Sequence, residues 1–343
     1  MKILYGIQAT GNGHISRSRV MAKYFKERNI DVTYLLSGRE KDQLFDMEIF
    51  GDFLYREGLT FITREGKIDN WQTVKRNNVF RFVYDVMSLD VKQYDLVITD
   101  FEPVTAWAAK LAGVNSLAIG HQYAFGEHTP VAGSNMFATS LLKYFAPAKR
   151  SLGLHWSRYN NNVLPPIIDV NLERTMGTGT VLVYLPFEDQ LSVTQMLNNI
   201  SGQQFVQYSQ DLADGEIGNV KLRKTSYLGF KEELKRAKAV ICNSGFELNS
   251  ECIHLGIPIL TKPIAGQMEQ ESNALALSQL GYGKAVTSLS SCDIKDWLVN
   301  LPAQHFNTLP DVAQLIISWL MGETSYQSIE DFTANVWRQQ GLS

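Results

Sequence analysis

The stretch KILYGIQATGNGHISRSRVMAKYFKERNIDVTYLL, residues 2–36, decides the predicted fold. Its apolar run Ile3–Ile7 is typical of a buried parallel strand, and Val32–Leu36 is a second run of the same kind. Between them, residues 16–28 carry apolar side chains at helical spacing. Because a strand, a helix and a strand in succession form a right-handed crossover, this stretch predicts the start of a parallel sheet covered by helices.

The same alternation occurs in two separate series. The first continues with strands at Asp95–Thr99 and Ser116–Ile119, around a helix at Thr105–Leu111. The second series consists of predicted strands at Val181–Leu185, Phe205–Tyr208, Ala239–Cys242 and Ile259–Thr261 and of helices at 191–200, 231–237, 247–255 and 271–280. The pattern predicts an α/β protein with two similar halves and a crevice between the carboxyl ends of their parallel strands.

A polar, proline-containing segment separates the two series. We place an N-terminal domain at residues 1–165, a linker at 166–178 and a C-terminal domain at 179–322. The last segment, 323–343, is predicted to contain a helix that is free to pack back on the N-terminal domain. At 343 residues the chain is long enough for two domains, each with a core of its own.

Composition excludes several classes of protein. The formal net charge of −3 argues against a surface built to bind nucleic acid, and 45% hydrophobic residues argue against a disordered chain. Three cysteines without metal-ligand spacing predict neither a disulfide framework nor a metal site. The N-terminus lacks the apolar length of a signal peptide, and no run is long enough to cross a bilayer. We expect a cytoplasmic protein, and peripheral membrane contact stays open.

A glycine-containing turn follows the first strand. In this turn Gly11 and Gly13 allow backbone amides to approach a ligand near the start of a helix. A dinucleotide-binding turn would have glycine in place of Ser16, and a P-loop would continue with Gly-Lys-Ser or Gly-Lys-Thr, so neither pattern fits. His14 is either a general base or ligand contact at the helix start, or a histidine that caps its own loop.

A longer motif lies in the second half. Ser244 and Gly245 end a predicted strand and open a helix, where a hydroxyl and free amides suit a pyrophosphate. Glu251 follows about two turns later on the same face, where it is either a ribose contact or a surface carboxylate. After a Gly-Ile-Pro turn, Glu269 and Gln270 open another helix, either to meet sugar hydroxyls or as ordinary first-turn residues.

These pieces, Ser-Gly-x5-Glu, Gly-x-Pro and acid-Gln-x-x-Asn-Ala, resemble the donor-binding half of GT-B nucleotide-sugar glycosyltransferases. The resemblance is to the branch of the peptidoglycan N-acetylglucosaminyltransferase and the UDP-glucuronosyltransferases. It covers the whole chain, because the Gly-Asn-Gly-His turn is similar to the glycine-rich loop of the same families. It implies the GT-B fold, in which two Rossmann-like, doubly wound parallel-sheet domains face each other across a cleft.

The resemblance also assigns expected roles to residues. It implies that Ser244 and Gly245 bind the pyrophosphate, Glu251 the ribose, and Glu269 with Gln270 the donor sugar. No cofactor is expected beyond the nucleotide-sugar co-substrate, for which UDP is the first choice. The peptidoglycan enzyme has a longer glycine loop, and the acid at position 269 is closer to the glucuronosyltransferases. The identity of the donor sugar therefore stays open.

Two segments of the first half are placed to complete the cleft. Asp100 and Glu102 follow the strand Asp95–Thr99, and either could deprotonate an acceptor hydroxyl or cap the next helix. His121 follows the next strand, where it could touch the donor sugar or the acceptor. Since parallel strands carry their functional residues at their carboxyl ends, we expect these side chains to face the cleft.

Residues 71–81 and 137–154 combine aromatic and aliphatic side chains with lysine and arginine. Such a surface either rests on anionic lipid at the inner face of the membrane or belongs to a core helix with solvated lysines. In the first case the enzyme would reach a lipid-linked acceptor.

The sequence thus predicts a metal-independent, inverting transferase that moves a hexose-type sugar to a hydroxyl acceptor, such as a cell-envelope glycan or a lipid-linked acceptor. Two other activities remain open on the same fold. One is a UDP-sugar 2-epimerase, and the other is a nucleotide-sugar-binding protein without catalysis.

Overall fold

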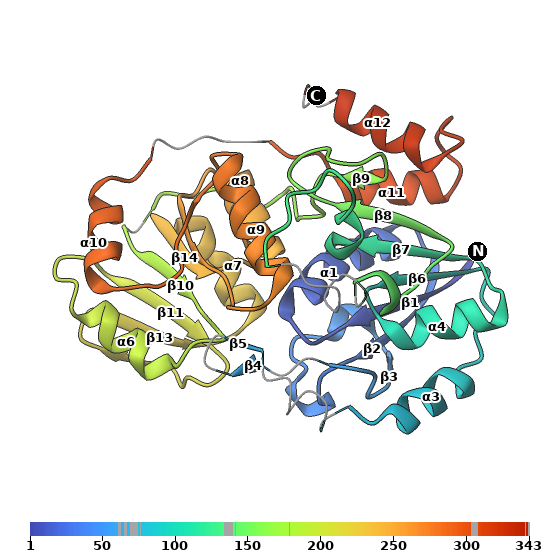
Figure 1. Cartoon of the computed structure of the whole chain (residues 1–343), viewed down its shortest axis with the longest axis horizontal. Helices are drawn as coiled ribbons and strands as arrows, with labels where there is room; N and C mark the ends of the chain where they lie inside the picture. Colours follow the sequence, from blue (N-terminus) through green and yellow to red (C-terminus); the bar gives the residue numbers. More distant parts are fainter. Residues whose placement is uncertain are drawn as a thin grey trace.

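The computed structural model describes the whole chain except residues 61–62, 65–66, 69–74, 76, 134–139, 141, 178, 303–307, 340 and 342–343, and the side chains of 63–64 and 67–68. In the described part, two seven-stranded sheets stand side by side, each with helices packed against it (Figure 1). A short hairpin of β4 (Thr63–Arg64) and β5 (Lys67–Ile68) stands apart from both. The predicted α/β class with two parallel sheets is confirmed.

The first sheet has the strand order β3-β2-β1-β6-β7-β8-β9, and its pairs are parallel. Its strands are β1 (Lys2–Gln8), β2 (Asp31–Ser37), β3 (Leu54–Tyr55), β6 (Leu96–Asp100), β7 (Ser116–Gly120), β8 (Arg150–Leu154) and β9 (Val163–Leu164). The connecting helices are α1 (Asn12–Glu27), α3 (Val79–Ser88) and α4 (Pro103–Ala112), with the 3-10 turns η1 (Lys41–Gln43), η2 (Glu48–Phe50) and η3 (His121–Ala124). The order reverses between β1 and β6, so the carboxyl ends of these two strands border a ligand crevice.

The second sheet repeats this plan in the order β12-β13-β11-β10-β14-β15-β16. Its strands are β10 (Val181–Tyr184), β11 (Phe205–Ser209), β12 (Gly215–Ile217), β13 (Val220–Lys224), β14 (Ala239–Asn243), β15 (Ile259–Lys262) and β16 (Lys284–Ala285). Its helices are α6 (Gln190–Asn198), α7 (Tyr227–Arg236), α8 (Phe246–Leu255), α9 (Met268–Gln279) and α10 (Ser291–Val299). Among the described strand pairs of this sheet, β12 with β13 is antiparallel and the others are parallel. Here the reversal lies between β10 and β14.

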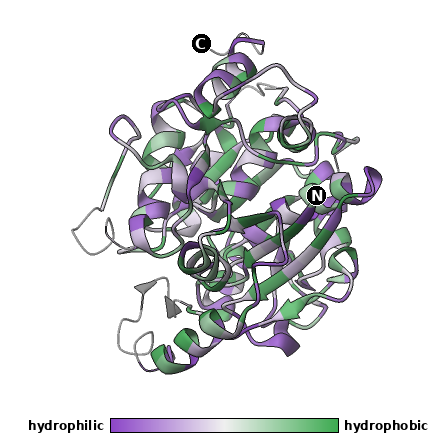
Figure 2. Cartoon of the chain, turned by 90° about the vertical axis from the view of Figure 1, so that its right-hand side faces the viewer, coloured by the Kyte–Doolittle hydropathy of each residue, from purple (hydrophilic) through white to green (hydrophobic). Residues whose placement is uncertain are grey.

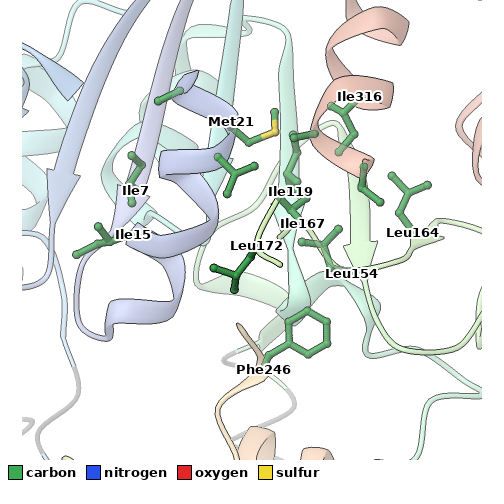
Figure 3. Packing of buried hydrophobic residues seen from close by; sticks show 14 of the residues in the cluster. Ile7, Ile15, Met21, Ile119, Leu154, Leu164, Ile167, Leu172, Phe246 and Ile316 are labelled. Carbon is green, nitrogen blue, oxygen red and sulfur yellow. The ribbon is translucent and has the colours of Figure 1, made fainter. Parts of the chain in front are cut away.

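The apolar cores of the halves are continuous. Hydrophobic residues, green in Figure 2, are frequent on the strands inside the molecule. Figure 3 shows Phe246 of α8 beside Leu154 of β8, and Ile316 near Ile119 and Leu164, all within one buried cluster. Phe246 belongs to a helix of the second half. Hydrophobic burial therefore stabilises the contact between the two halves as well as the packing of helices on each sheet.

The end of the chain crosses back to the first half. Helix α11 (Val312–Leu320) packs against α1, and α12 (Ile329–Gln339) packs against β9. Trp337 donates from its indole nitrogen to the carbonyl of Val163 at 2.7 Å. The segment that returns to the first half therefore includes α11, which lies before the predicted boundary at residue 322. The division of the chain into domains remains our proposal.

Two local predictions need correction. Helix α1 begins at Asn12 rather than near residue 16. The glycine that predicted a turn, Gly13, lies inside the helix, where its missing Cβ leaves room for the Glu247 carboxylate. Residues 150–154, predicted as the end of an amphipathic surface or core helix, form strand β8; Gly153 fits there because a Cβ would lie 2.6 Å from the Cα of Ala124. Most of segment 71–76 and residues 134–139 and 141 lie outside the described residues.

Candidate active site

The reversal points of the two sheets face each other across one cleft. Helix α1 leaves β1 at the first point, and α8 leaves β14 at the second, and the two helices are in contact. Asn12 at the start of α1 donates to the hydroxyl of Tyr184 at the end of β10, at 2.9 Å. The predicted arrangement of two carboxyl edges around one crevice is therefore present, and the candidate residues can be placed on it.

His14 lies in the first turn of α1 and is paired with Asp100 at the end of β6. Its Nδ1 is 2.7 Å from Asp100 Oδ1. The His14 side chain is 13% exposed, whereas Asp100 is fully buried. The ring lies nearly parallel to that of Phe101, which adopts a φ of 53°, rare outside glycine. Asp100 thus cannot reach an acceptor itself, and His14 is the member of the pair that can.

Arg17, one turn after His14, holds the other side of Asp100. Its Nε donates to Asp100 Oδ2 at 2.6 Å, Nη2 donates to Oδ1, and Nη1 donates to Glu247 on α8. Although burial alone would raise the pKa of Asp100, the Arg17 guanidinium and His14 hold it below its usual range. Asp100 is therefore a carboxylate at neutral pH.

Glu102 has a structural role instead of the catalytic one considered from sequence. It is the N-cap of α4, and its carboxylate accepts from the amides of Val104 and Thr105 at 2.8 and 2.7 Å. The hydroxyls of Ser37 and Thr105 donate to the same carboxylate, both at 2.6 Å. Burial raises the pKa of Glu102, and these hydrogen bonds oppose that rise. With both oxygens occupied and no solvent exposure, the carboxylate has no access to a substrate.

His121 is buried at the contact between the halves. Its Nδ1 lies 2.8 Å from the carbonyl of Leu154, and its Nε2 lies 2.6 Å from Asn273 Oδ1 on α9. Its ring stacks on Phe246 with centroids 4.0 Å apart. Burial lowers its pKa, although Glu269 and the hydrogen bonds act in the opposite direction. We interpret His121 as a structural contact that joins the two halves.

Three helices begin at the cleft without a side-chain cap. They are α1 after Gly11, α8 after Gly245 and α9 after Gln267. By contrast, α3, α4, α6, α7, α10 and α11 each have a capping side chain. The first amides of an uncapped helix need another partner, and together with the helix dipole they favour an anion. The motif residues predicted to bind pyrophosphate therefore stand at one of these uncapped starts, that of α8.

Ser244 and Gly245 form the start of α8. Ser244 is buried, and its hydroxyl lies 2.9 Å from that of Thr261 on the neighbouring strand β15. Asn273, in the second turn of α9, donates to the Ser244 carbonyl at 2.9 Å and so ties the start of α8 to α9. Open space surrounds the position that a Cβ at Gly245 would take. The turn is thus held by hydrogen bonds on the Ser244 side and is open at Gly245.

Glu251 lies one turn after Glu247 on α8 and pairs with Lys231 of α7. Burial raises its pKa, and Lys231 offsets part of that rise. Both residues line an open cavity of about 110 Å³. Its walls come from both halves and include Asn12, Arg19, Tyr227, Phe230, Lys231 and Glu251. The lining of this cavity thus combines aromatic side chains with a charged pair.

Glu269 and Gln270 open α9 beside the same cleft. Gln122 of the first half donates to Glu269 at 3.0 Å, and its Nε2 lies 3.5 Å from His14 Nε2. Gln270 accepts from the amide of Ile264 at 3.0 Å and so fixes the loop before the helix. Glu269 is therefore near His14, whereas Gln270 stabilises the loop that precedes α9.

Sequence reasoning missed Arg17, Glu247 and Lys231. Arg17 stands three residues after His14, which places the two side chains on one face only if the helix begins by Asn12. Glu247 stands four residues before Glu251, so the i,i+4 spacing on α8 was a usable signal. Lys231 had no such signal, because its pairing joins separate helices. Within the described residues, no group of three histidine, cysteine or carboxylate side chains could hold a metal ion.

The model of glycosyl transferase family 1 matches residues 1–302. The chain therefore belongs to this family. An uncharacterized glycosyltransferase of Methanosarcina acetivorans is 34% identical over 80 residues, which make up 22% of this chain and 21% of that protein. The matched part thus spans about a fifth of the length of that relative.

Solved structures show the same fold. UDP-GlcNAc 2-epimerase from Neisseria meningitidis, bound to UDP-GlcNAc, is similar over 94% of this chain and 100% of that chain, with a TM-score of 0.60 and 14% identity. MurG from Acinetobacter baumannii is similar over 94% and 100%, with a TM-score of 0.56 and 14% identity. The predicted GT-B arrangement and the resemblance to glycosyltransferases are confirmed.

Proposed function

We propose that this protein is an inverting glycosyltransferase that moves a hexose-type sugar from a nucleoside diphosphate, with UDP as first choice, to a hydroxyl acceptor. One observation carries the proposal: the His14–Asp100 pair stands across the cleft from the uncapped start of α8. A proton acceptor and an anion site on opposite sides of one cleft are what sugar transfer from a diphosphate needs.

The donor would lie along the second half. The diphosphate binds the free amides of α8 beside Ser244 and Gly245, and the ribose hydroxyls reach Glu251. The base packs between Tyr227 and the apolar wall of the cavity. The donor sugar then projects toward Glu269, near His14. On the opposite side, the position of a Cβ at Gly11 is open, whereas Gly13 makes room for the Glu247 carboxylate.

In the reaction, His14 Nε2 accepts the proton of the acceptor hydroxyl. The acceptor oxygen forms a bond to the anomeric carbon as the bond from that carbon to the diphosphate breaks, so the configuration inverts. Asp100 holds the ring by Nδ1 and stabilises the imidazolium that forms. The amides of α8 stabilise the leaving diphosphate, so we propose a reaction independent of metal.

A thermal-shift screen tests the donor site. We expect UDP to raise the melting temperature, because at 100 times its Kd it adds about 2.7 kcal/mol to the free energy of unfolding. NAD and ATP should have no such effect. Glu251→Ala should lose most of the UDP response, while Glu232→Ala, a change at an exposed position of α7, should keep it. A full UDP response in Glu251→Ala contradicts the ribose role.

Product analysis separates the proposal from the alternatives. A transferase releases UDP in proportion to an acceptor glycoside with inverted anomeric configuration, which NMR coupling constants report. A 2-epimerase instead gives UDP and a sugar changed at C2 without any acceptor. A binding protein shows the thermal shift and no turnover.

We further propose that the acceptor is lipid-linked and that α3 touches the inner face of the membrane. Five apolar side chains of α3 are each more than half exposed: Val79, Phe80, Val83, Tyr84 and Met87. The helix forms part of the lower edge of the molecule in Figure 1, beside α4 with its exposed Lys110. In the described part of the chain, none of the helices is long and apolar enough to cross a bilayer.

Flotation with vesicles tests this contact. We expect the protein to float with vesicles that contain anionic phosphatidylglycerol, and Phe80→Asp with Met87→Asp to reduce the floated fraction about tenfold. Leu191→Asp, a change at an exposed apolar residue on α6 of the other half, serves as control. Equal flotation of both variants contradicts the contact through α3.

A further inference from the structure

His14 Nδ1 has two neighbours that make opposite demands on it. Asp100 Oδ1 lies 2.7 Å away, and Arg17 Nη2 lies 2.6 Å away. A carboxylate only accepts hydrogen bonds, so contact with Asp100 requires a proton on Nδ1. A guanidinium only donates, so contact with Arg17 requires a bare Nδ1. A neutral ring satisfies one neighbour at a time.

The choice between the neighbours decides whether His14 can act as a base. When Nδ1 donates to Asp100, the lone pair is on Nε2, the nitrogen that would accept a proton from the acceptor. When Nδ1 accepts from Arg17, the neutral ring carries its proton on Nε2 and cannot take another there. The position of the Arg17 hydrogens therefore controls the reactivity of the histidine.

Glu247 of the second half holds Arg17 in place. It accepts from Nη1, while Nε is bound to Asp100. Only 2% of the Arg17 side chain is exposed, so water cannot replace a lost partner. Without Glu247, the buried guanidinium must satisfy its hydrogens on the remaining acceptors, and His14 Nδ1 is already within reach.

We propose that Arg17 is a positioning residue that couples the two halves of the protein: anchored by Glu247, it leaves His14 with its proton on Nδ1 and its base on Nε2. Glu247 is in the first turn of α8, the helix whose start is proposed to bind the diphosphate. The same helix thus holds the leaving group and sets the tautomer of the base. The catalytic part of this inference rests on the proposed role of His14.

Nuclear magnetic resonance measures the tautomer directly. In protein labelled with ¹⁵N-histidine, long-range ¹H–¹⁵N spectra distinguish the Nδ1–H from the Nε2–H form, and His14→Gln identifies the His14 signals. Glu247→Gln keeps an oxygen acceptor without charge, and Glu247→Met removes the acceptor. We expect a graded shift toward Nε2–H, and a fall in kcat of about tenfold at saturating donor for Glu247→Met.

Glu323→Gln and Glu323→Met are the matched controls. Glu323 also pairs with an arginine, Arg28, which directly follows α1 on the surface and away from His14. These variants should leave both the tautomer and kcat unchanged. An Nδ1–H form and a wild-type kcat in folded Glu247→Met would overturn the proposal.

The two proposals can fail separately. If the wild-type protein transfers no sugar and Glu247→Gln still shifts the tautomer, the coupling stands and the proposed function fails. If wild type transfers sugar while both Glu247 variants keep the Nδ1–H form, the function stands and the coupling is overturned.

Discussion

Helices α4 and α8 occupy corresponding places in the two halves, and their first turns are built in opposite ways. Each follows the strand next to the reversal point of its sheet, β6 or β14. The start of α4 is closed by Glu102, which accepts from two of its amides. The start of α8 follows Gly245 and has no side-chain cap. The N-cap side chain of one helix satisfies its first amides, and at the other we propose that a ligand does so.

In the proposed function, this difference assigns a separate role to each half. The edge of the first half is already bonded within the protein, because His14, Asp100 and Arg17 are mutually connected without any substrate. The edge of the second half has open space at Gly245 and no side-chain cap on α8. Proton chemistry needs a preorganised group, whereas donor binding needs free donors of hydrogen bonds.

The largest effect is expected from the bonded edge. His14→Ala removes the proton acceptor, so kcat should fall about 10²- to 10⁴-fold while UDP still raises the melting temperature. Initial rates of UDP release and thermal shifts measure the two quantities. A variant with wild-type kcat would place the base elsewhere and remove the contrast between the two edges.

Closing α8 in the manner of α4 provides the second test. Gly245→Asp places a carboxylate at the N-cap, where it accepts from the amides and repels a diphosphate, so UDP affinity should fall about 100-fold. Calorimetry measures the affinity. Gly245→Ala adds a Cβ without a carboxylate and should bind UDP far better than the aspartate variant. Equal affinity in both would mean that the amides of α8 do not bind the diphosphate.

Opening α4 is the reciprocal test. Glu102→Ala removes the cap and leaves Ser37 and Thr105 without their acceptor, so stability should fall by about 2 kcal/mol. Because Glu102 has no access to substrate, kcat of the folded variant should stay near that of wild type. Urea unfolding and steady-state rates measure these effects. A large loss of kcat at full folding would return Glu102 to the candidates for the base.

The smallest effect concerns the pH dependence of the contact between the halves. Burial, with a smaller contribution from His121, holds the pKa of His155 well below its ordinary value near 6.5. The unfolded chain therefore binds a proton that the folded protein does not, and this contribution to stability is full above about pH 6.5 and declines as the pH falls below it. The slope stays under about 1.4 kcal/mol per pH unit.

His155→Gln should reduce this dependence, whatever its effect on absolute stability. Unfolding free energies between pH 8 and 5 measure the slope, and His128→Gln is the control because its ring is exposed. Equal slopes in wild type and His155→Gln would contradict the assignment.

Sequence indicated those features that depend on neighbouring residues. The strand and helix alternation and the turn at Gly245 follow from local spacing, and both sheets are present as predicted. Strand β8 was missed because the fit of Gly153 depends on Ala124, which is remote in sequence and comes close only in the folded protein. Short buried strands of this kind carry too few residues for a clear period.

The candidate site divides in the same way. The motif around Ser244 and Glu251 was visible because several parts occur in order. Asp100 and Glu102 looked equivalent, since each is an acid after the same strand. Only the partners distinguish them: Asp100 binds a histidine and an arginine from another element, and Glu102 binds the helix that it begins. Ion pairs between helices have no signature in a single sequence.

The return of α11 and α12 to the first half determines how the protein could be divided. A fragment that stops at the linker would lack α11 and α12. The apolar surface that Ile316 and Trp337 cover would then be exposed to water. A separable first lobe would have to be built by splicing residues 1–165 to the segment that starts before α11. A fusion or split reporter of the first half should therefore include both residues 1–165 and the segment that contains α11 and α12.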